Sequence, residues 1–177
     1  PLPRWENGKN CGTEEKSGLA RLLEMISALP GNFAVRPLYI HPDHFNRDIL
    51  PVMRKDKRLL PYFDIPFQSG SENIIHKMNR KGGAAEYLRL ASDIREALPG
   101  ASLRTTFLTG FPGETDADAA ETVEFLKKLK SDWSGCFPYS REEDTPAYSM
   151  KNRVKADVAK RRAGELVSVQ AEITRQS

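Results

Sequence analysis

Residues 103–115 have the sequence LRTTFLTGFPGET. The first six are mostly apolar or β-branched, which favours a buried strand, and two glycines with a proline over 110–114 are typical of a tight turn. Thr115 follows, and Asp118 stands three residues after it, close to the capping box that begins a helix. This stretch therefore predicts a strand that leads through a short turn directly into a helix.

The same pattern extends to both sides of this segment. Further strands are predicted over 32–40, 62–66 and 133–137, and helices over 17–29, about 46–54, from Ser71, over 87–98, from Thr115 and over about 156–175. Strand and helix alternate in units of about 30 residues, which indicates βαβ crossovers, an α/β fold and a mainly parallel sheet. Four strands are too few to close a barrel, so the sheet is either open, or curved and completed by sequence outside this chain.

Composition indicates a soluble globular chain. It has 177 residues, of which 39% are apolar, and no apolar run approaches the roughly 18 residues that a membrane span needs. We therefore expect a cytoplasmic protein without a membrane partner. The formal net charge of +3 divides into +4 for residues 151–177, which hold seven basic and three acidic side chains, and −1 for the rest. The basic end is interpreted as a solvated helix face, with a local contact to RNA or a ribosome as the alternative.

The two cysteines, Cys11 and Cys136, are too few and too far apart for a disulfide framework or a Cys-x-x-Cys metal site. Cys136 is predicted to be a buried structural thiol. The three histidines do not have the spacing of a metal site, so no metal ligands are assigned in this chain.

Ligands bind at the carboxyl ends of the strands in parallel α/β sheets. The predicted strands and the turns after them carry eight candidate cofactor-binding residues, which are Asp64, Gln68, Ser71, Arg104, Gly110, Gly113, Glu114 and Tyr139. No residue is assigned a catalytic role.

Each of these candidates also has a structural interpretation. Gly110 and Gly113 would let a ligand approach the main chain closely, or would simply make a tight turn. Asp64 and Arg104 are either a structural ion pair or ligand contacts, because a charge in an apolar strand needs a partner. The segment 68–71 either hydrogen-bonds a ribose or carboxylate, or caps the next helix.

Residues 19–174 resemble the central domain of the radical S-adenosylmethionine methylthiotransferases. The resemblance depends on four ordered motifs, which are YFDIPFQSGS at 62–71, MNR at 78–80, LRTTFLTGFPGET at 103–115 and FPYSREEDTPA at 137–147. It implies a partial TIM-type (β/α)6 barrel that holds S-adenosyl-L-methionine and a [4Fe-4S] cluster at its mouth. The implied organisation is an irregular lead-in (1–16), the partial barrel (17–150) and a basic helix (151–177) that leads toward a TRAM domain.

One departure from that family concerns the cluster. The family binds it through Cys-x-x-x-Cys-x-x-Cys, which this sequence lacks, so we expect no cluster to be bound by this chain itself. Two explanations stay open. The chain is either part of a longer enzyme and inactive alone, or a non-catalytic binding or scaffold domain that has lost the chemistry.

Within the family, residues 135–140 and 160–173 are more similar to the branch that adds a methylthio group to the β-carbon of an aspartate in small-subunit ribosomal protein uS12. The expected partner is therefore uS12 or the small ribosomal subunit. The branch that makes 2-methylthio-adenosine in tRNA is the alternative, with tRNA as the partner.

Overall fold

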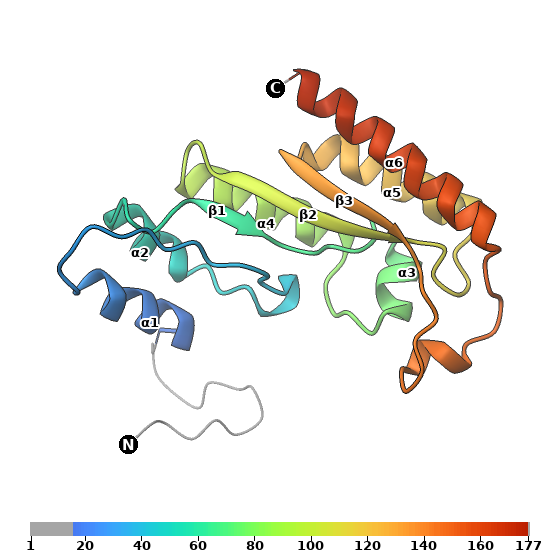
Figure 1. Cartoon of the computed structure of the whole chain (residues 1–177), viewed down its shortest axis with the longest axis horizontal. Helices are drawn as coiled ribbons and strands as arrows, with labels where there is room; N and C mark the ends of the chain where they lie inside the picture. The colour runs from blue at the N-terminus through green and yellow to red at the C-terminus, as the bar shows by residue number, and fades with distance from the viewer. Residues whose placement is uncertain (1–15, 177) are drawn as a thin grey trace.

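A computed structural model describes residues 16–176 and contains a parallel sheet with strand order β1-β2-β3 (Figure 1). In chain order the elements are α1 (Gly18–Ser27), η1 (Pro42–His44), α2 (Ile49–Lys55), β1 (Tyr62–Asp64), α3 (Glu72–Lys77), α4 (Ala84–Ala97), β2 (Ser102–Thr109), α5 (Asp116–Leu129), β3 (Trp133–Pro138), η2 (Pro146–Ser149) and α6 (Ala156–Gln176). Helices α4 and α5 lie behind the sheet in the view of Figure 1, and α6 packs against β3, β2 and α5.

The central strand β2 separates two faces of the sheet by strict alternation of its side chains. One set is buried beneath the helices and consists of Leu103, Thr105, Phe107 and Thr109. The other set, Arg104, Thr106 and Leu108, is half-buried on the opposite face, which no helix covers in Figure 1. The two-residue period of side chains along a strand explains this arrangement. The uncovered face therefore carries both polar and apolar side chains.

Aromatic side chains form the centre of the core between the sheet and its helices. Phe67, which follows β1, lies with its ring 5.0 Å from that of Tyr87 in α4 and 5.7 Å from that of Phe125 in α5. Phe107 of β2 meets Phe125 edge to face at 6.1 Å. Since all four rings are buried, burial of apolar area here is the main force that holds α4 and α5 on the sheet.

Helix α6 packs directly on the end of β2. Thr109 Oγ1 donates a hydrogen bond to the carbonyl of Ala159 at 2.8 Å. Gly110 follows with φ +76°, and a Cβ at this position would lie 2.3 Å from the Ala159 Cβ. Only glycine satisfies both the left-handed backbone and this close approach.

The structure confirms most of the predicted elements, including the parallel sheet, the helix from Thr115 and the terminal helix. The predicted strand over 32–40 is wrong, because this segment forms only a single bridge, between Val35 and Leu59. Pro37 has no N–H to donate, and Tyr39 adopts a left-handed φ of 56°, so the ladder breaks between Val35 and Ile40. The sheet of the described residues therefore has three strands instead of four.

Gly110→Ala tests the close packing of α6 on β2. We expect it to lower the free energy of unfolding by about 3 kcal/mol, because the new methyl group collides with Ala159 and the backbone is left-handed. Gly164→Ala is the matched control on α6, where nothing lies within 4 Å of the added Cβ. It should stabilise the protein by about 0.5–1 kcal/mol. Urea unfolding measures both, and equal effects of the two changes would contradict this packing.

Candidate functional site

The carboxyl ends of the three strands lie at one edge of the sheet, because all neighbours are parallel. Strand β1 ends at Asp64, β2 at Thr109 and β3 at Pro138. The loops that follow these strands contain the motifs identified in the sequence. This edge is the place where a ligand of a parallel α/β fold is expected.

A row of three side chains crosses the uncovered face. Asp64, Arg104 and Trp133 are register partners on adjacent strands, so their side chains lie on the same side. Arg104 Nη1 donates to Asp64 Oδ2 at 2.6 Å, and the Arg104 guanidinium carbon lies 4.9 Å from the Trp133 ring centroid. The structure thus shows the ion pair that the sequence left as one of two alternatives.

This row retains unused polar and apolar groups. Asp64 Oδ1 is buried and has no hydrogen-bond partner among the described residues. The Arg104 side chain keeps 29% of its surface exposed, while Trp133 and Phe137 are 53% and 52% exposed. A buried carboxylate oxygen without a donor is costly. The face therefore offers a hydrogen-bond acceptor, a cation and two aromatic rings to a ligand.

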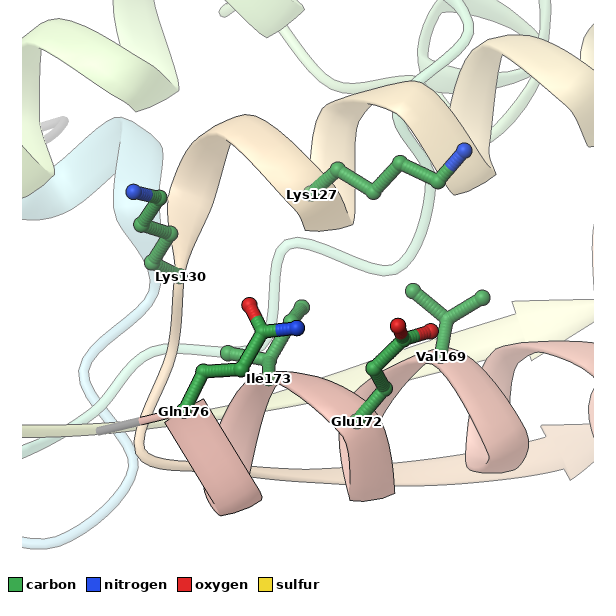
Figure 2. Close-up of a pocket in the computed structure, with 6 residues that line it drawn as sticks. All are labelled: Lys127, Lys130, Val169, Glu172, Ile173 and Gln176. Carbon is green, nitrogen blue, oxygen red and sulfur yellow. The ribbon is translucent and has the colours of Figure 1, made fainter.

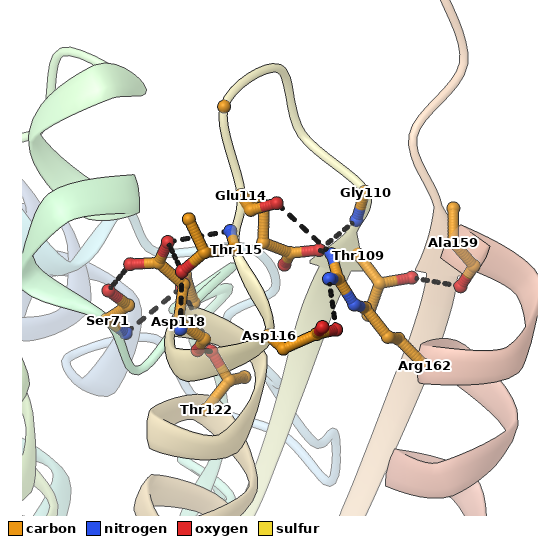
Figure 3. A network of polar contacts seen from close by, with 12 residues as sticks. Ser71, Thr109, Gly110, Glu114, Thr115, Asp116, Asp118, Thr122, Ala159 and Arg162 are labelled. Atoms are coloured by element: carbon orange, nitrogen blue, oxygen red, sulfur yellow. Dashed lines mark hydrogen bonds and ion pairs between the residues drawn. The ribbon is translucent and has the colours of Figure 1, made fainter. Parts of the chain in front are cut away.

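Asp118 joins the loop after β1 to the start of α5 (Figure 3). Its Oδ1 accepts hydrogen bonds from Ser71 Oγ at 2.6 Å and from Asn73 Nδ2 at 3.1 Å. Its Oδ2 accepts from the Thr115 hydroxyl at 2.6 Å and from the Thr115 amide at 2.8 Å. The capping box predicted from Thr115 and Asp118 is confirmed. Burial raises the pKa of Asp118, but these donors outweigh it and lower the pKa to about 2.

Ser71 does not cap α3 with its side chain, although it occupies the N-cap position. Its hydroxyl is committed to Asp118, while its amide donates to Ser69 Oγ at 3.1 Å. Ser69 Oγ and the Gly70 amide both lie 3.1 Å from Thr122 Oγ1. The loop after β1 is thus fixed to α5 by side-chain hydrogen bonds.

A buried ion pair holds the turn after β2 (Figure 3). Glu114 Oε2 accepts from the Gly110 amide and from Arg162 Nη1, each at 2.6 Å. Arg162 Nη2 also donates to Asp116 Oδ1 at 2.7 Å. The Glu114 and Arg162 side chains are only 2% and 7% exposed. Burial raises the pKa of Glu114, and the Gly110 amide and the Arg162 guanidinium act in the opposite direction.

The remaining predicted residues lie around these groups. Gln68 has a left-handed φ of 71° and joins β2 through its backbone, and its side chain has no hydrogen-bond partner among residues 16–176. Gly113 has φ +83° and packs against Lys77, which donates to its carbonyl at 3.1 Å. Tyr139 meets Phe111 edge to face at 5.4 Å. Contacts of the eight predicted residues with a cofactor stay a prediction.

Arg162 was not among the predicted site residues, although the sequence contains a signal for its buried position. It lies on the buried stripe of α6 between Ala159, Ala163 and Leu166, at positions where an apolar residue is expected. A charged side chain at such a position requires a buried partner of opposite charge. The sequence does not show that Glu114 is that partner, because the two residues are far apart along the chain.

The described residues do not fit an iron–sulfur cluster. Residues 16–176 contain no group of three or more histidine, cysteine, aspartate or glutamate side chains that could hold a metal. Cys136 is half-buried rather than fully buried, its Sγ lies 3.7 Å from Ser134 Oγ, and burial raises its pKa while that contact lowers it. Cys11 lies outside the described residues. Such clusters need several thiolates, so these residues supply no step through a cluster.

A separate pocket of about 410 Å³ lies between α5 and α6 (Figure 2). Lys127 of α5 and Lys130, which follows that helix, line one side, and Val169, Glu172, Ile173 and Gln176 line it from α6. The carboxyl half of α5 runs back toward the amino ends of the parallel strands. This pocket is therefore remote from the strand ends and is not part of the candidate site. No helix among the described residues is long and apolar enough to cross a membrane.

Residues 16–126 match the Radical SAM superfamily, a range that contains β1, β2 and most of α5. The chain belongs to the radical SAM superfamily. Its fold is also similar to that of coproporphyrinogen III oxidase from Escherichia coli, described as a radical SAM enzyme, with a TM-score of 0.70 at 16% identity over 88% of this chain and 36% of that one. Together these findings support the predicted partial TIM-type barrel of the superfamily.

Two sequence relatives lie closer than the structural neighbour. The ribosomal protein uS12 methylthiotransferase RimO of Treponema denticola is 52% identical over 98% of this chain and 40% of its own length. The protein of the same name from Thermotoga sp. strain RQ2 is 42% identical over 90% of this chain and 37% of its own. The chain thus spans about two fifths of the length of these radical SAM relatives.

The hydrogen bonds to Asp118 predict that the free energy of unfolding falls at acid pH. Because the folded pKa is about 2 and the ordinary value is 3.8, stability from this carboxylate is fully present above pH 4 and lost as the pH falls toward 2. Its contribution is about 2 kcal/mol. Asp118→Asn should lower the free energy of unfolding at pH 7 and flatten its fall between pH 4 and pH 2. An unchanged slope in the variant would show that other groups govern this acid transition.

Proposed function

We propose that this chain is the barrel part of a radical SAM methylthiotransferase that adds a methylthio group to the β-carbon of an aspartate in ribosomal protein uS12. The observation that carries the proposal is the 52% identity over 98% of the chain to a protein named as a uS12 methylthiotransferase. The uncovered face of the sheet, where Asp64 ends β1, supports it, because it presents unused groups suited to a nucleoside cofactor. This substrate implies a cytoplasmic enzyme that works with uS12 or the small ribosomal subunit.

S-adenosylmethionine supplies the radical source and the methyl group for this reaction when it is bound. Its proposed binding site is the row of Asp64, Arg104 and Trp133. Asp64 Oδ1 would accept a hydrogen bond from the cofactor's ammonium or ribose hydroxyls, and the Arg104 guanidinium would bind its carboxylate. The exposed ring of Trp133 would exclude water from one side of the bound nucleoside.

Other predicted residues position the mouth of the site in this proposal. Ser71 and Glu114 fix the loops after β1 and β2 through Asp118 and Arg162. Gly110 and Gly113 permit the turn between them, and Gln68 and Tyr139 flank the same edge. Cluster ligands come from sequence outside the described residues. Rigid loops around the site orient a bound cofactor at low entropic cost. Radical chemistry at a single carbon requires such an orientation.

Asp64→Asn tests the proposed binding site in the complete enzyme that contains this chain. It removes the negative charge that faces a cationic cofactor, so the Kd for S-adenosylmethionine should rise about tenfold. Asp93→Asn is the matched control, because Asp93 also accepts from an arginine at 2.6 Å, but on the exposed surface of α4. The Kd of the Asp93→Asn variant for S-adenosylmethionine should equal that of the wild type. Isothermal titration calorimetry measures both Kd values. An unaltered Kd for Asp64→Asn would refute cofactor binding at this row.

The substrate is tested by mass spectrometry of ribosomes and tRNA from a strain that lacks the complete gene. We expect the methylthio-aspartate of uS12 to disappear while 2-methylthio-adenosine in tRNA persists. The reverse pattern would assign the enzyme to tRNA. Retention of both modifications would favour a binding or scaffold role without catalysis.

A further inference from the structure

A small pocket with a mainly apolar lining and three cationic residues lies at the amino end of α6, next to the ends of β2 and β3. Its volume is about 220 Å³, and Gly110, Tyr139 and Ala156 line it together with three cationic side chains, Arg141, Arg153 and Lys160. No aspartate or glutamate is among its lining residues. The cations come from the segment after β3, from the residues before α6 and from α6 itself.

The three cations are available for a ligand. The side chains of Arg153 and Lys160 have no hydrogen bond or ion pair with any residue in the range 16–176. Arg141 Nε donates to the Tyr148 carbonyl at 3.0 Å, and its guanidinium carbon lies 3.5 Å from the Tyr148 ring centroid. This stacking fixes the plane of the Arg141 guanidinium, while its two terminal nitrogens donate to no described residue. Three like charges around one pocket without a counterion favour an anionic ligand.

Two neutral features lie at the same place. Ala156 is the first residue of α6, a helix of 21 residues, and the free amides and dipole of such an end attract anions. The Tyr139 hydroxyl is buried and has no partner among the described residues, although buried hydroxyls almost always have one. Asp157, an acid in the first turn of α6, is exposed and does not line the pocket.

We propose that this pocket binds a phosphate group. Its volume is below the roughly 300 Å³ of sites for drug-sized ligands, so it suits one compact anion. Cations from three separate segments around one pocket suit the several oxygens of a tetrahedral anion better than a planar carboxylate. S-adenosylmethionine is a poor ligand here, since its sulfonium and ammonium make it a net cation. The phosphate is either a free one or a phosphodiester of an RNA strand.

Lys160→Gln and Arg153→Gln in the complete protein test this site by ³¹P NMR titration with inorganic phosphate at constant ionic strength. Each variant should weaken phosphate binding about tenfold, the usual effect of losing one charge-assisted hydrogen bond. Arg161→Gln is the matched control, because it removes the same charge from the next residue of α6, which does not line the pocket. It should change the Kd by less than about twofold. All three residues are exposed, and thermal melting verifies that the variants fold.

Competition distinguishes the sources of the phosphate. Displacement of inorganic phosphate by a short single-stranded RNA would identify a backbone contact, and saturable binding without displacement would identify a free phosphate. The proposal is overturned if phosphate does not saturate, if Arg161→Gln weakens binding as much as Lys160→Gln, or if S-adenosylmethionine displaces phosphate. Cofactor binding and uS12 modification are measured separately, so failure of this site leaves the proposed function unaffected.

Discussion

Glu114 is a carboxylate buried in the turn after the central strand, and the geometry of the loops at the strand ends depends on its pairing. It accepts from the Gly110 amide and from Arg162, both at 2.6 Å, which ties the turn after β2 to α6. Removing one partner of a buried pair costs about 3–5 kcal/mol, because the other charge stays buried. The same turn begins α5, whose capping residue Asp118 extends the network to Ser71 in the loop after β1. The ion pair and the hydrogen bonds of Asp118 together connect the loops after β1 and β2 to α5 and α6.

The charges form two regions of opposite preference, one on the uncovered face of the sheet and one at its carboxyl edge. The uncovered face carries Asp64 with one unpartnered oxygen, which suits a cationic cofactor. The pocket at the amino end of α6 carries Arg153 and Lys160, whose side chains have no partner among the described residues, and none of the described residues that line it is an acid, which suits an anion. The turn of Gly110 lies between α6 and the end of β2, beside the second region, whereas the register of β1, β2 and β3 places the side chains of the first.

Local patterns in the sequence were sufficient for most of the fold. Alternation in β2 and the capping box at Thr115 were predictable because they depend on neighbouring residues alone. The failed strand over 32–40 contains apolar residues typical of a strand, but Pro37 and the left-handed Tyr39 prevent a ladder. Residues that pair across the fold, such as Arg162 with Glu114 and Ser71 with Asp118, were not predictable, since nothing local specifies a partner about 50 residues away.

The central claim is that the uncovered face of the sheet seats S-adenosylmethionine in a uS12 methylthiotransferase. A crystal structure of the complete protein with S-adenosylmethionine tests it most directly. We expect the ligand on the row of Asp64, Arg104 and Trp133, with Asp64 Oδ1 within hydrogen-bond distance of one of its donors. A cofactor bound elsewhere, with Asp64 still facing only Arg104, would contradict the account.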